Sequence, residues 1–174
     1  MRLDPKYFNL FIGICAVITL LVILFSTFRY VENQEEMFEE TLDQTEIENR
    51  KLAYLNQSDS LRIGDLQGDP VVIHFWATWS GKAKNMHEAL ANIAEKKPGL
   101  KVVAASVKDV KELIKEYISE TDYPFIYVDG TDLFHDLQVP GVPSQIILKR
   151  DGTVSDMQVG EGVEELSNKI DEVL

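Results

Sequence analysis

A serine, a histidine and two tryptophans lie close together in FWATWSGKAKNMHEAL, residues 75–90. An apolar strand-like run leads into a short polar turn and a helix-like pattern, a layout typical of a reactive side chain at the start of a helix. A serine becomes a nucleophile only beside a base that a third group orients. His87 follows Ser80 by about two helical turns, roughly 10 Å along the axis, which is beyond hydrogen-bond reach. His74 on the preceding strand could approach from below, but no acid accompanies it.

Ser80 therefore has a simpler interpretation as the N-cap of the helix that follows it, since serine is among the preferred capping residues. Serine catalysis stays open as the weaker alternative. The two tryptophans divide between core and surface: we expect Trp76 inside the protein and Trp79 at the mouth of the turn.

The histidines and the cysteine do not predict a metal site. His74, His87 and His135 are not paired at a ligand spacing such as H-x-x-x-H, and we expect His87 to be exposed or half-exposed. Cys15 is the single cysteine, which excludes a zinc site built from cysteines and an intramolecular disulfide. The sequence predicts no metal and no cofactor.

The charge balance narrows the classes of partner. The chain has 174 residues, 45% of them hydrophobic, with 29 acidic against 17 basic residues and a formal net charge of −12. Nucleic-acid binding needs a cationic surface that displaces phosphate counterions, so this class is excluded. Electrostatic docking on anionic lipid is disfavoured for the same reason.

Residues 7–28 form an uncharged apolar run. As a helix it would be about 33 Å long, enough to cross the hydrocarbon core of a bilayer. It is longer than the core of a signal peptide and no small-residue cleavage site follows, so we predict an uncleaved transmembrane anchor over residues 1–30. Arg2 and Lys6 precede the run, and the positive-inside bias places the N-terminus in the cytoplasm and the rest of the chain outside it.

Residues 31–60 are strongly acidic, and their apolar residues drift from helical spacing. We expect a partly helical, solvated stalk. A short oligomerising coiled coil is the sharper alternative, but three sustained heptads are missing, and the sequence leaves the oligomeric state open.

From residue 61 to 174 the pattern becomes α/β. Strand-like and helix-like segments follow in the order β-α-β-α-β, a short helix, then β-β-α, which predicts a central mixed sheet with helices on both faces. The expected strands are 61–63, 71–77, 101–106, 125–128, 144–148 and 154–159. The expected helices are 80–96, 109–121, 132–137 and 162–174. In the second helix, Leu113, Tyr117 and Ile118 are expected to face inward.

Four features of this region occur together in one known family. VVIHFWATWSGKA follows that family's strand–Trp–Ala–x–Trp–Cys–x–x–Cys layout except at the two cysteines, and DPVV (69–72) leads into its strand. VPGVPS (139–144) and KRDGTV (149–154) have the form of a proline loop and the hairpin after it. Residues 61–174 thus resemble the thioredoxin superfamily, and most of all its membrane-tethered, extracytoplasmic members of the TlpA and ResA type. The resemblance implies a thioredoxin-like fold.

The resemblance also implies thiol–disulfide exchange by two cysteines, but this chain has Ser80 and Ala83 at those positions. Exchange needs a thiolate that attacks a disulfide sulfur, and neither residue supplies one. His74 lies where relatives often have a buried acid or amide, and His87 where they have a helix-kinking proline. Both differences fit a chain without redox chemistry, so we do not carry the activity over.

A binding surface could survive this loss. The resemblance places Trp79, Ser80 and Gly81 beside a cis bond between Val142 and Pro143. In relatives that segment pairs with an extended substrate peptide through strand-like hydrogen bonds.

The leading hypothesis is a membrane-anchored, extracytoplasmic, redox-inactive thioredoxin-like protein. It would bind or scaffold an envelope or membrane protein, held as an extended peptide at the proline loop. One alternative is a thiol–disulfide oxidoreductase like its relatives, and another is a structural subunit of a membrane assembly.

Overall fold

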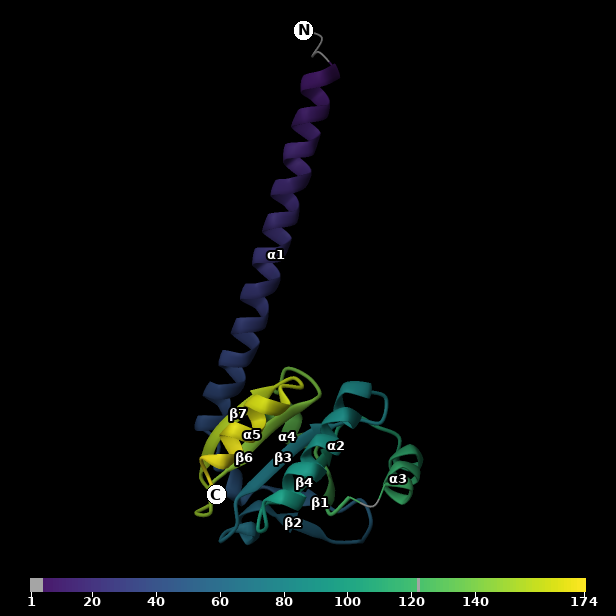
Figure 1. Ribbon diagram of the computed structural model, residues 1–174, viewed down its shortest axis with the longest axis vertical. Helices are drawn as coiled ribbons and strands as arrows, with labels where there is room; N and C mark the ends of the chain where they lie inside the picture. The colour runs from purple at the N-terminus through teal and green to yellow at the C-terminus, as the bar shows by residue number, and fades with distance from the viewer. Residues whose placement is uncertain (1–4, 122) are drawn as a thin grey trace.

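A five-stranded mixed sheet forms the centre of the protein (Figure 1). The computed structural model describes residues 5–121 and 123–174. The strand order is β5-β4-β3-β6-β7; β3, β4 and β5 run parallel, whereas β6 and β7 run antiparallel to their neighbours. The strands are β3 (Val71–Trp76), β4 (Lys101–Ser106), β5 (Ile126–Asp129), β6 (Ser144–Leu148) and β7 (Val154–Val159). This order of strands and helices confirms the predicted mixed sheet.

Helices cover both faces of the sheet, and β3, at its centre, is therefore buried along its whole length. Alternate residues of β3 point to opposite faces, so Val72 packs with α2 and α5 while Ile73 and Phe75 pack with α4 on the other side. The helices of this region are α2 (Gly81–Lys96), α3 (Lys111–Glu120), α4 (Thr131–Asp136) and α5 (Val163–Asp171).

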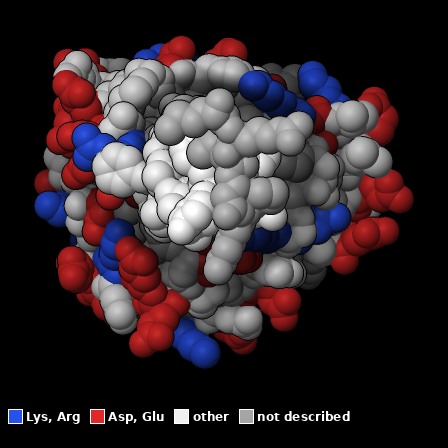
Figure 2. Space-filling view, turned by 90° about the horizontal axis from the view of Figure 1, so that it is seen from above, with Lys and Arg blue, Asp and Glu red and all other residues white. Residues whose placement is uncertain are grey.

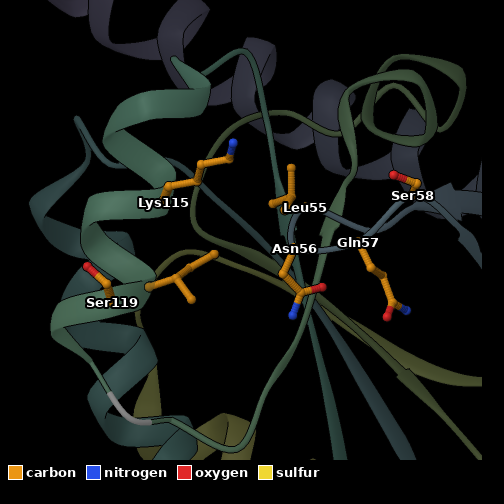
Figure 3. A pocket seen from close by; sticks show the side chains of 7 residues that line it. Leu55, Asn56, Gln57, Ser58, Lys115 and Ser119 are labelled. Atoms are coloured by element: carbon orange, nitrogen blue, oxygen red, sulfur yellow. The ribbon is translucent and has the colours of Figure 1, made fainter.

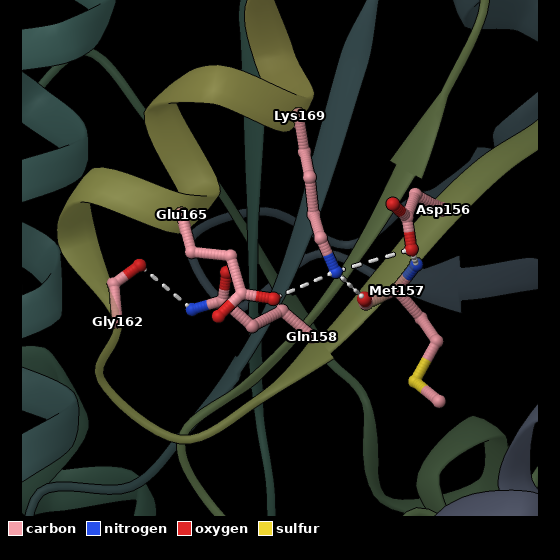
Figure 4. Close-up of polar contacts among 6 residues, drawn as sticks. All are labelled: Asp156, Met157, Gln158, Gly162, Glu165 and Lys169. Carbon is pink, nitrogen blue, oxygen red and sulfur yellow. Dashed lines mark hydrogen bonds and ion pairs between the residues drawn. The ribbon is translucent and has the colours of Figure 1, made fainter.

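A lysine fixes α5 to the edge strand β7 (Figure 4). Lys169 Nζ donates to the backbone oxygen of Met157 at 2.8 Å and pairs with Asp156 at 3.2 Å and Glu165 at 3.1 Å. Gln158 Nε2 donates to the backbone oxygen of Gly162 at 2.9 Å, which ties the strand to the start of the helix.

The segment before residue 61 is more ordered than we expected. It contains the short strand β1 (Lys51–Ala53), the 3-10 turn η1 (Ile47–Asn49) and the first residue of β2 (Ser60–Arg62). The 3-10 turn η2 (Ile63–Leu66) follows β2. Phe38, Leu42 and Ile47 are buried in the same core as Phe75. The expectation of a solvated stalk is therefore wrong for these residues, because their apolar side chains pack on one face of the sheet. The irregular helical spacing in the sequence did not predict this packing.

One helix, α1 (Pro5–Asp43), joins the apolar N-terminal run to the domain (Figure 1). Within the described residues it is the one helix long and apolar enough to cross a membrane. From Tyr7 to Val31 its residues are exposed. Arg2, on which the predicted orientation partly rests, lies outside the described residues. The division of the chain at residues 30 and 60 stays a prediction.

The inward face of α3 agrees with the expected one for Tyr117 and Ile118 but not for Leu113. Ile114 is buried and Leu113 is exposed, whereas Tyr117 and Ile118 are half-buried against the cluster around Trp76. The sequence pattern left two stripes close to one another on this short helix. The packing against β4 and β5 selected the one that carries Ile114.

Charged side chains are mixed over the face seen from above (Figure 2). Acidic side chains lie round much of the outline, and basic ones lie among them rather than in one continuous patch. This distribution agrees with the expectation from the net charge of −12.

Candidate functional site

The turn between β3 and α2 carries the residues singled out in the sequence. Ser80 is the N-cap of α2: its hydroxyl oxygen accepts a hydrogen bond from the backbone N–H of Ala83 at 3.3 Å. Trp79 is 67% exposed, whereas Trp76 and Ala83 are fully buried. The predicted division of the tryptophans and the capping role of Ser80 are thus confirmed.

The proline loop lies at the same end of the sheet. Phe75 of β3 pairs with Ser144, the first residue of β6, so the loop before β6 is next to the turn after β3. The Val142–Pro143 peptide bond is cis, as the resemblance implied. The backbone N–H of Gly160 donates to the Pro143 oxygen at 2.9 Å, and the Ser144 hydroxyl donates to the Gly141 oxygen at 2.8 Å.

An aspartate from a third loop holds the turn. Both carboxylate oxygens of Asp109 accept from Thr78: one from its backbone N–H, the other from its hydroxyl at 2.8 Å. Across the site, Lys82 of α2 pairs with Glu161 at 3.2 Å, with both side chains partly exposed. Loops after β3, β4 and β7 and the loop before β6 therefore meet at one end of the sheet, which we call the site edge.

Two histidines lie in contact beneath this turn. His74 and His87 are both fully buried, and their ring centroids are 5.0 Å apart in an edge-to-face arrangement. The expectation that His87 is exposed or half-exposed is wrong, because its position on α2 faces the sheet beside Met86 and Leu90. His74 Nδ1 is 3.2 Å from Gln145 Nε2, and His87 Nδ1 is 3.0 Å from the Tyr117 hydroxyl.

Burial keeps both imidazoles neutral. It lowers the pKa of His74 to about 4. Burial, and next the positive charge that His74 could carry, lower the pKa of His87 to about 2. The same burial raises the pKa of the neighbouring Tyr127 to about 12, so its hydroxyl stays protonated. The pair is an uncharged part of the core at neutral pH.

Aromatic rings close the remaining sides of His87. Trp76, Phe125 and Tyr117 have ring centroids 4.4 to 5.5 Å from its ring. Sequence reasoning identified the two histidines but missed Tyr117 and Gln145 as their partners. A signal for Tyr117 was present in its expected inward position on the helix predicted over 109–121, but only the fold brings that helix against α2.

Neither histidine serves Ser80 as a base. Their hydrogen bonds go to Gln145 and Tyr117, and the Ser80 hydroxyl is engaged by the Ala83 backbone. The alternative of serine catalysis therefore finds no support in the geometry. Nor do the described residues contain a group of three or more histidine, cysteine, aspartate or glutamate side chains placed to hold a metal ion.

A separate open groove lies between α3 and the loop after β1 (Figure 3). It has a volume of about 490 Å³, and its walls include Asn56, Gln57, Lys115 and Ser119. None of the candidate site residues from the sequence analysis lines it, so the groove is separate from the site edge.

Residues 68–154 match the model of a family described as thioredoxin-like, which is half of the chain and includes Trp79, Ser80, Ala83 and the proline loop. The chain belongs to the thioredoxin-like family.

Curated proteins that resemble the chain are named for thiol–disulfide chemistry. The thiol-disulfide oxidoreductase ResA of Bacillus cereus is 24% identical over 115 residues, which are 63% of this chain and 65% of that protein. The thiol:disulfide interchange protein DsbE of Vibrio cholerae is 26% identical over 98 residues, 55% of this chain and 52% of that protein. The chain thus spans between half and two thirds of the length of these two thioredoxin-like relatives.

Solved thioredoxin-like structures agree with the fold. MTB dsbF superposes with a TM-score of 0.65 at 19% identity, over 73% of this chain and 96% of that one. A secreted Mycobacterium tuberculosis disulfide oxidoreductase homologous to E. coli DsbE gives a TM-score of 0.63 at 20% identity, over 73% and 98% of the two chains. At these identities the likeness establishes the thioredoxin-like fold.

Proposed function

We propose that this protein is a membrane-anchored, extracytoplasmic thioredoxin-like protein that has lost thiol exchange and binds an extended segment of an envelope or membrane protein. The observation that carries the proposal is the chemistry at the start of α2. Ser80 caps the helix and Ala83 is buried in its first turn, so no thiol is present at the site edge. The only cysteine, Cys15, belongs to the apolar part of α1.

The surface left at the site edge supports binding. Trp79 projects from the turn with two thirds of its surface exposed, and Val142 lies half-buried on the neighbouring loop. A large aromatic side chain on a firmly held turn contributes contact area at little entropic cost, which is why tryptophan is frequent at binding hot spots. Asp109 and the N-cap of α2 hold this turn in place without any disulfide.

The named activity of the relatives is the competing function. If the chain were a thiol–disulfide oxidoreductase, it would need a nucleophile that the described site does not contain. In an insulin reduction assay, we expect the full-length protein in detergent to match the blank. Reduction that disappears on Ser80→Ala would overturn the loss of exchange.

Binding is tested with linear peptides selected by display against the full-length protein in nanodiscs. We expect Trp79→Ala to weaken the affinity for the selected peptides by about tenfold or more, in the range of a hot-spot truncation. Leu174→Ala is the matched control, because Leu174 is also an exposed apolar residue but its backbone oxygen accepts from Arg150 at the opposite end of the sheet. Equal losses for both variants, or none for Trp79→Ala, would contradict binding at the site edge.

A further inference from the structure

The anchor helix and the domain form one continuous body. α1 runs without a break from Pro5 to Asp43, so the apolar stretch and the turns that touch the domain belong to the same helix. Phe38 and Leu42 are buried in the domain core, and Gln138 Nε2 donates to the Thr41 hydroxyl at 3.0 Å. The domain therefore cannot turn freely on its anchor.

The direction of α1 along the sheet decides which end of the domain meets the membrane. Leu42 and Asp43 line a hollow together with 152–154, at the hairpin between β6 and β7. Nearer the N-terminus, Gln34 and Met37 line another hollow with Gln138 and Val139, which lead into the proline loop.

β7 itself runs from Val154 at the hairpin to Val159, which pairs with Ser144 at the site edge. Going toward its N-terminus, α1 thus passes from the hairpin end of the sheet to the site edge and leaves the domain there (Figure 1). The apolar stretch lies beyond the site edge, not beyond the hairpin.

The separation from the membrane follows from the rise of a helix. Phe28 ends the apolar run, and Gln34 and Met37 follow it by six and nine residues. At 1.5 Å per residue these distances are about 9 and 14 Å along the axis. Part of that height belongs to the headgroup layer. The gap between the site edge and the hydrocarbon is therefore only about one layer of polypeptide thick.

We infer that the site edge faces the bilayer and binds the extended juxtamembrane segment of an integral membrane protein. This inference rests on the proposed binding function and names its partner class. A folded domain is about 30 Å across and does not fit the gap, whereas one extended strand with its side chains occupies about 10 Å. Glu32, Glu35 and Glu36 of α1 border the gap and outnumber Arg29, which pairs with Glu32 at 3.9 Å. A segment with basic residues therefore matches this stretch best.

The orientation is measured by energy transfer to the lipid surface. Lys82 and Lys149 are exposed lysines at the site edge and at the hairpin end, so Lys82→Cys and Lys149→Cys make a matched pair for a donor dye. Each is prepared in a Cys15→Ala background and reconstituted in phosphatidylcholine vesicles that carry an acceptor on the headgroups. The six-residue strand between the two ends makes position 82 about 20 Å closer to the lipid.

We expect transfer from position 82 to exceed transfer from position 149 by about twofold with a dye pair of short Förster distance. Equal transfer, or more from position 149, would overturn the orientation. Neither result depends on whether the site edge binds a peptide, so this experiment can fail while the proposed function holds.

The partner class is measured by photo-crosslinking in intact membranes, with the crosslinking amino acid at position 82 or 149. We expect position 82, but not 149, to capture integral membrane proteins within about ten residues of a membrane span, the length that an extended chain needs to cross the site edge. Captures that map to soluble proteins, or to regions far from any span, overturn the inference. If position 82 captures no more protein than position 149, the inference and the proposed function are both overturned.

A lengthened anchor separates the two proposals further. Eleven helix-forming residues inserted between Val31 and Glu32 add about three turns, which raises the domain by about 16 Å with almost the same facing. We expect the juxtamembrane captures to fall by about fivefold or more, because the gap then exceeds one layer of chain. Affinity for the selected soluble peptides should stay unchanged. Captures that persist at full level contradict the inference and leave the binding function standing.

Discussion

The imidazole rings of His74 and His87 lie edge to face with their centroids 5.0 Å apart, both wholly buried between β3 and α2. The backbone of Ala83, at the position of the family's second cysteine, lies beside them. Neither Nε2 atom has a hydrogen-bond partner within the described residues. An uncharged, half-satisfied pair of histidines thus fills the space beneath a site without thiols.

This pair predicts that stability falls as the solution becomes acidic. Burial lowers the folded-state pKa of His74 to about 4 and that of His87 to about 2, below the unfolded value near 6.5. The stabilisation that the two neutral histidines contribute is complete above pH 6.5. It is lost as the pH falls, because only the unfolded chain then binds the protons. At pH 5 the loss is roughly 2 kcal/mol for each histidine.

Urea unfolding of the full-length protein in detergent at pH 7.5 and pH 5 measures the loss. His87→Phe keeps an aromatic ring but cannot titrate. Between the two pH values we expect its free energy of unfolding to fall by about 2 kcal/mol less than that of the wild type. The exposed His135 supplies the control, since His135→Phe should leave the loss at its wild-type size. Identical pH dependence in His87→Phe and wild type would contradict this expectation, because His87 would then bind its proton as readily in the folded chain as in the unfolded one.

The backbone geometry around Ser80 and Ala83 predicts that cysteines introduced at these two positions restore thiol–disulfide exchange. We expect Ser80→Cys with Ala83→Cys, in a Cys15→Ala background, to form a disulfide and to reduce insulin above the blank. The cysteines would occupy the cap and the first turn of α2, where the helix N-terminus lowers a thiol pKa. Ser80→Cys alone should form mixed disulfides with glutathione without resolving them. A double variant that keeps two free thiols under oxidising conditions contradicts this expectation.

The buried C-terminal part of α1 predicts that truncating one of its side chains lowers the free energy of unfolding strongly. Phe38 is fully buried, so Phe38→Ala should destabilise the domain by about 3 to 5 kcal/mol through lost burial and a cavity. The neighbouring Met37 is 41% exposed, and Met37→Ala should cost about 1 kcal/mol or less. Denaturant unfolding compares the two variants. Similar small costs would mean that this turn of α1 is a solvated stalk after all.

The N-cap of α2 predicts a smaller cost. Ser80→Ala removes the acceptor for the Ala83 N–H and should cost about 1 kcal/mol, whereas Ser80→Asp keeps an acceptor and should cost little. Both are measured by the same unfolding curves. A loss of several kcal/mol for Ser80→Ala would point to a role of the hydroxyl beyond capping.

Much of the fold could be predicted because its signals are local. The all-apolar run of β3, the Asp-Gly turn of the β6–β7 hairpin and the helical stripe of α2 each need only their own residues. The same holds for Ser80, whose capping bond spans three residues. The missing thiols at Ser80 and Ala83 are likewise plain in the printed sequence.

The partners of the buried histidines could not be predicted, because they come from distant parts of the chain. Gln145 is 71 residues from His74, and Tyr117 is 30 residues from His87. Burial of His87 itself depends on which face of α2 meets the sheet. A local pattern that contains one polar residue among apolar ones does not decide this.

The sequence alone determined that the protein has an apolar segment able to span a membrane, an α/β region and no pair of cysteines to exchange, because these are properties of composition and local spacing. The resemblance of its motifs to the thioredoxin superfamily implied which α/β fold this is. Only the tertiary structure decided that Phe38 and Leu42 fix α1 to the core and that α1 leaves the domain at the edge that carries Trp79 and Val142. These relationships depend on contacts across the sheet, which form when the whole chain packs and leave no mark in any one segment.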